Sequence, residues 1–169
     1  MRAFRFAIAA IAAIALAPIS GGAMAQAIKQ IQLTEKQVQN YIASQKEIAA
    51  LVQKFPGRPG EQPDPSFLAG IEAAAKKHGF ASLAEFGDVS ENISLLMNCI
   101  DPKTKVFSEP KVALQRDIDE LKTSNAIPEP QKKQMLQDLN EALKVAEPIK
   151  YRSNIELVTK YYDQIDTTA

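Results

Sequence analysis

His78 and Cys99 are the single histidine and the single cysteine of this 169-residue chain. With a carboxylate such as Glu85 or Asp88 they could make a triad, which needs a nucleophile, a base and an orienting acid in contact. A simpler explanation of His78 is its place at the end of a predicted helix, where a partly charged ring favours the dipole and bonds the last carbonyls. We therefore rank an enzyme lowest among the function classes and expect no catalytic residue.

Cys99 follows Leu95 and Leu96 at helical spacing, on the apolar side of its predicted helix. A buried cysteine behaves as a small hydrophobe whose thiol has a raised pKa and is inert. The alternative is a free thiol that forms an intermolecular disulfide or is a redox target. The apolar neighbours favour burial.

Metal and cofactor motifs are equally sparse. Zinc sites normally use several closely spaced cysteine or histidine ligands, and the chain has one of each. The stretch from Asp101 to Val112 begins like an EF-hand loop, but Lys103 and Lys105 stand at ligand positions and no glutamate closes it. There is no Gly-rich phosphate loop and no G-x-S-x-G elbow. We expect neither a metal nor a cofactor.

The first 25 residues have the form of a secretory signal peptide. Two arginines precede an apolar run from Phe6 to Ile19, and Ala23-Met24-Ala25 has the small-x-small form that signal peptidase requires. The alternative, an uncleaved membrane anchor, is disfavoured because the run is short for a bilayer and a cleavage site follows it. We expect cleavage after Ala25, export to a bacterial periplasm, and no transmembrane segment in the mature chain.

The mature chain, residues 26–169, contains 144 residues, which suits a single domain. The leader removes two of the 20 basic residues, so 18 remain against 20 acidic residues, a net charge of −2. A net charge this close to zero is typical neither of a nucleic-acid-binding protein nor of a protein with a polybasic membrane-binding patch. Because one cysteine cannot form an internal disulfide, stability must come from an apolar core.

Apolar residues recur at three- and four-residue spacing along nearly the whole mature chain, which predicts helices. Sustained period-two alternation between hairpin turns is missing, so we expect essentially no sheet. The fold class is all-α, a small bundle of about five or six amphipathic helices with antiparallel neighbours.

Capping signals mark the ends of these helices. A residue that can cap a helix stands at each of four predicted starts: Thr34 with Gln37, Asp64 before Pro65, Ser82 with Glu85, and Ser108 before Pro110. Gly79 can adopt the left-handed conformation that closes a helix after His78. Gly87 could kink the next helix or restart it one turn later.

The clearest amphipathic stripe follows Pro130, and its apolar positions are Met135, Leu136, Leu139, Ala142, Leu143 and Ala146. A final short helix is marked by Ile155, Val158, Tyr162 and Ile165. Residues 56–65 contain four prolines and two glycines, so neither a helix nor a sheet can run through them. We interpret them as an exposed loop within one domain. A domain boundary is the weaker alternative, because the first helix alone could not bury its apolar face.

Leu33-Thr34-Glu35-Lys36-Gln37 resembles the L-T-x-x-Q motif of the Spy/CpxP-like periplasmic proteins. Ile127-Pro128-Glu129-Pro130-Gln131 resembles a degenerate second copy that departs at both leading positions. That resemblance implies an exported, all-helical, dimeric protein that shields unfolded clients without ATP or senses envelope stress. The leader, the Leu33-to-Val38 segment and the Lys76-to-Phe86 turn are also similar to uncharacterised exported helical proteins of alpha-proteobacteria, a likeness that implies location and fold without an activity.

Two function classes follow from these observations. The leading prediction is a non-catalytic periplasmic helical protein, chaperone-like or stress-related, whose partners are other periplasmic proteins or the envelope surface and not nucleic acid. The alternative is a small-molecule or lipid binder with a pocket between helices, lined by Tyr41, Phe67, Phe86 and Tyr162. The sequence does not fix the oligomeric state.

Overall fold

The computed structural model describes residues 28–55 and 63–168. The expected signal peptide and most of the Pro/Gly segment 56–65 lie outside these residues. The described chain forms six α-helices and contains no strand, which confirms the all-α prediction and the predicted number of helices. None of its helices combines the length and the hydropathy needed to span a bilayer. The assignment of residues 26–169 to a single domain stays a prediction.

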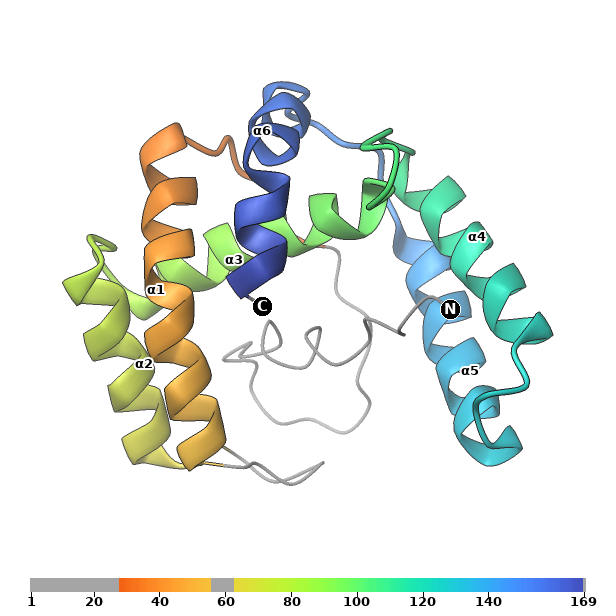
Figure 1. Ribbon diagram of the computed structural model, residues 1–169, viewed down its shortest axis with the longest axis horizontal. Helices are drawn as coiled ribbons and strands as arrows, with labels where there is room; N and C mark the ends of the chain where they lie inside the picture. The colour runs from red at the N-terminus through yellow and green to blue at the C-terminus, as the bar shows by residue number, and fades with distance from the viewer. Residues whose placement is uncertain (1–27, 56–62, 169) are drawn as a thin grey trace.

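Four helices pack together into what we call the four-helix body: α1 (Glu35–Lys54), α2 (Pro65–Lys77), α3 (Leu83–Cys99) and α6 (Ser153–Thr168). Helix α1 contacts the other three, and α3 contacts both α2 and α6. In Figure 1, α3 runs across α1 and α6. Every helix of the body therefore covers its apolar side with at least two partners.

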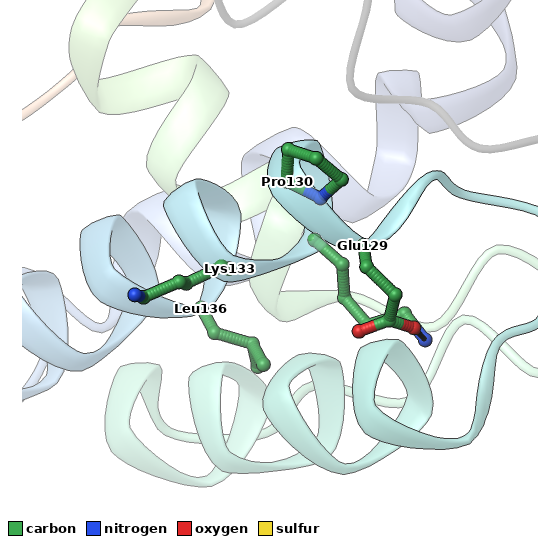
Figure 2. A pocket seen from close by; sticks show the side chains of 5 residues that line it. Glu129, Pro130, Lys133 and Leu136 are labelled. Carbon is green, nitrogen blue, oxygen red and sulfur yellow. Dashed lines mark hydrogen bonds and ion pairs between the residues drawn. The ribbon is translucent and has the colours of Figure 1, made fainter.

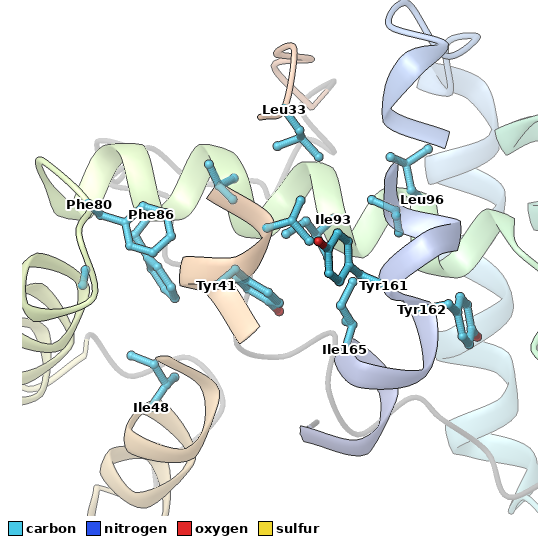
Figure 3. Close-up of a cluster of buried hydrophobic side chains, with 14 of the residues drawn as sticks. Leu33, Tyr41, Ile48, Phe80, Phe86, Ile93, Leu96, Tyr161, Tyr162 and Ile165 are labelled. Carbon is cyan, nitrogen blue, oxygen red and sulfur yellow. The ribbon is translucent and has the colours of Figure 1, made fainter. Parts of the chain in front are cut away.

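The core of this body is one cluster of buried apolar side chains (Figure 3). Its fully buried members include Val38 on α1, Ile71 on α2, Val89 and Ile93 on α3, and Val158 on α6. Burying such a side chain completely contributes about 1.5–3 kcal/mol relative to leaving it exposed. The packing of these stripes, rather than helix propensity, stabilises the body.

The starts of α1 and α3 are capped as predicted and are joined to each other. Thr34 Oγ1 accepts a hydrogen bond from the Gln37 amide at 3.2 Å, and Gln37 Oε1 accepts one from the Thr34 amide at 3.0 Å. Ser82 Oγ accepts a hydrogen bond from the Glu85 amide at 3.1 Å, but the predicted capping box is not reciprocal, because the Glu85 carboxylate accepts from the Ala81 amide at 2.7 Å. Gln37 Nε2 also donates to Glu85 Oε1 at 3.0 Å. Two local caps thus become one contact between helices.

Gly79 closes α2 in the left-handed conformation that its position predicts, with φ of +90°. The amides of Gly79 and Phe80 donate to carbonyls of the last turn of α2, at 3.1 and 3.0 Å, which is the pattern of a Schellman motif. A Cβ atom on Gly79 would lie 2.8 Å from Asn40 Nδ2. Phe80 is buried and meets Phe86 edge-on, with ring centroids 5.3 Å apart. This corner fixes the direction in which α3 leaves α2.

Helices α4 (Pro110–Thr123) and α5 (Glu129–Val145) form a separate pair that we call the α4/α5 hairpin. Helix α4 contacts α3 and α5, whereas α5 contacts α4 alone among the described helices. Figure 1 shows the hairpin on the opposite side of the molecule from α1 and α2. Lys132 is the sole buried residue of α5.

Two predicted details are wrong. The N-cap of α4 is Glu109 and not Ser108, because the Ser108 amide donates to the Cys99 carbonyl at 2.8 Å instead of opening a helix. The last helix is not short, since α6 has 16 residues and begins at Ser153, before its first apolar marker. Helix α3 does not restart after Gly87 but is one continuous helix from Leu83 to Cys99.

Candidate functional site

His78 and Cys99 lie near opposite ends of α3 and cannot contact each other. His78 caps α2 just before α3 begins, while Cys99 is the last residue of α3. At 1.5 Å per residue, the 17-residue helix separates them by about 25 Å. The sequence predicts that the His78 ring bonds the last carbonyls of α2. In the structure, His78 Nε2 instead lies 3.1 Å from Glu47 Oε2 on α1. Lys77 and His78 hold the pKa of Glu47 below its ordinary value.

Cys99 is 2% exposed, in agreement with the burial predicted from its helical spacing. Burial, with a smaller contribution from the nearby Glu109 carboxylate, raises the pKa of its thiol to about 12. Such a thiol stays protonated at neutral pH and is a poor nucleophile. Cys99 lies where α3 meets the start of α4, so its surroundings report on the joint between the body and the hairpin.

The four aromatic residues predicted to line a pocket do not surround one common space. Tyr41 and Phe86 are brought together in the core, with ring centroids 6.2 Å apart. Phe67 is half-buried and packs on Phe55 at 5.9 Å. Tyr162 lies across α6 from Tyr41 in Figure 3. A small-molecule or lipid pocket between helices stays a prediction, and the contacts of these rings are those of a packed core.

The stretch that begins like an EF-hand loop is a tight turn held by its own side chains. Asp101 Oδ1 accepts bonds from the amides of Lys103 and Thr104, both at 2.9 Å. Lys105 adopts a positive φ of 56° and reaches α6, where its Nζ lies 2.5 Å from Asp163 and 3.8 Å from the centre of the Tyr162 ring. No group of three or more histidine, cysteine or acidic side chains that could hold a metal occurs among the described residues.

The predicted stripe of α5 is present, but α4 covers it only in part. All six of its apolar positions are half-buried, namely Met135, Leu136, Leu139, Ala142, Leu143 and Ala146. Two further valines of the hairpin are exposed, Val112 to 60% and Val145 to 39%. A helix of an ordinary globular core buries such a stripe against several partners, whereas α5 has α4 as its one partner among the described helices.

An open hollow of about 460 Å³ lies beside the first turns of α5 (Figure 2). Leu136, Pro130 and the paired Lys132 and Glu129 line it, and Leu136 points toward α4. The Lys132 ammonium lies 2.7 Å from the Glu129 carboxylate, which neutralises its charge. Lys133 lines the hollow as well, so apolar and charged side chains share its wall.

Sequence reasoning missed an extended segment that precedes α1, which we call the N-terminal strap (residues 28–33). Two asparagines hold its backbone: Asn92 on α3, 3% exposed, and Asn154 on α6, 2% exposed. Both asparagines lie inside helices and match no capping signal. The alternation in Ile31-Gln32-Leu33 was the available signal, but it is too short to distinguish from the start of a helix.

A scan against protein-family models and searches of curated proteins and of solved structures found no match to this chain. The candidate site is therefore interpreted from its geometry alone. That geometry provides a half-buried apolar stripe on α5, and it keeps a half-buried His78 far from a buried Cys99.

Proposed function

We propose that the mature chain is a non-catalytic periplasmic protein that binds other proteins through the apolar side of the α4/α5 hairpin. The observation that carries this proposal is the packing of α5, which contacts α4 alone among the described helices while every apolar position of its stripe stays only half-buried. A partner that covers this face would complete the burial that the chain leaves unfinished.

The expected strength of such binding follows from the area that remains exposed. Complete burial of a large apolar side chain contributes about 1.5–3 kcal/mol, and a half-buried position of the stripe keeps only a minor part of its surface exposed, so covering that part contributes less than about 1 kcal/mol. Association costs roughly 4–15 kcal/mol in lost translational and rotational freedom. A handful of half-buried side chains therefore supports only weak, transient contacts, which suits the shielding of many clients better than one permanent complex.

Export is the second part of the proposal and is supported by the leader sequence. Mass spectrometry of the protein recovered from a bacterial periplasm should give a chain that begins at Gln26. A chain that keeps its first 25 residues and sediments with membranes would contradict export with cleavage. The resemblance of the Leu33-to-Gln37 pentad to the L-T-x-x-Q motif agrees with this location.

The binding proposal is tested by suppression of aggregation of an unfolded model protein, without nucleotide. The mature chain in molar excess should reduce light scattering, and V112K/V145K should weaken the effect severalfold, because both valines are exposed apolar groups of the hairpin. The matched control is Q131K/Q137K, which adds the same charge at exposed polar positions of α5. Absence of suppression by the wild-type chain, or equal loss in both variants, would contradict the proposal.

A further inference from the structure

No further inference is drawn: the strongest candidate, the open hollow beside the first turns of α5, shares Leu136 with the apolar stripe already described, its buried Lys132 is paired with Glu129, and nothing in the structure shows what would fill it.

Discussion

The four-helix body and the α4/α5 hairpin contain helices of similar length and amphipathic pattern, yet they bury them very differently. In the body, every helix has at least two helical partners, and α3 alone buries seven of its residues. In the hairpin, α5 has one helical partner and buries only Lys132. The number of partners, and not the strength of the stripe, decides how much of a helix is covered.

This difference assigns different tasks to the two regions. The body has the packed core, the linked caps and the clamped N-terminal strap, which fix its geometry. In the hairpin, Ile118 and Leu121 of α4 are buried, whereas the apolar stripe of α5 is only half-buried. Among the described helices α5 has no contact with the body, so its stripe can be altered separately from the core of the body.

The largest difference is expected for matched truncations in the two cores. Ile93→Ala removes a fully buried side chain of the body and should lower the free energy of unfolding by about 2–5 kcal/mol. Leu139→Ala removes a half-buried side chain of α5 and should cost about 1 kcal/mol. Urea unfolding followed by circular dichroism measures both. Equal costs would show that the hairpin is as tightly packed as the body and would break the comparison.

A smaller effect is expected at two glycines of the body. Gly79→Ala should destabilise by about 1–2 kcal/mol, because it places a Cβ in the left-handed region and against the Asn40 side chain. Gly87→Ala is the matched control. Apart from its chain neighbours and the backbone of its own helix, no atom lies within 4 Å of its added Cβ, and alanine should stabilise α3 by about 0.5–1 kcal/mol. The midpoint temperatures of thermal unfolding should shift in opposite directions in the two variants. Shifts in the same direction would contradict the requirement for a left-handed glycine at position 79.

The joint between the two regions can be followed with Cys99. Its raised pKa and its burial predict no reaction with a thiol reagent at pH 8 in the folded chain. If the hairpin detaches before the body unfolds, Cys99 should react at urea concentrations at which the helical signal of the body is still intact. Reaction that begins only with global unfolding would show that body and hairpin unfold as one unit.

The smallest effect concerns acid. The pKa values of Glu35, Glu47 and Glu85 are lowered, chiefly by Lys160, by Lys77 and by the Ala81 amide, and all three carboxylates belong to the body. A lowered pKa in the folded state contributes stability above the ordinary glutamate value of 4.5, and that stability is lost as the pH falls below it.

Glu85→Gln should therefore reduce the loss of urea stability on acidification from about pH 6 to about pH 3. An unchanged slope in this variant would mean that the acid response does not come from the contacts of Glu85.

The sequence predicted the features that depend on neighbouring residues. The caps at Thr34, Asp64 and Ser82 and the closing glycine at position 79 act within one turn of a helix, so their spacing is sufficient to recognise them. The burial of Cys99 could be predicted for the same reason, because its apolar neighbours on α3 are close in sequence.

Contacts between distant parts of the chain could not be predicted in this way. Glu47 lies 31 residues before His78, and Asn154 lies 121 residues after Leu33. A polar side chain that bonds the backbone of another segment has no periodicity of its own. The partners of His78, Asn92 and Asn154, and the N-terminal strap itself, became visible only in the folded chain.

The sequence by itself determined an all-helical chain, the ends of most of its helices, and which face of each helix is apolar. The tertiary structure decided how completely each apolar face is covered. The stripe of α5 is the clearest in the sequence and among the least buried in the fold, because hydrophobic periodicity gives the direction of a face but not the number of helices that pack against it.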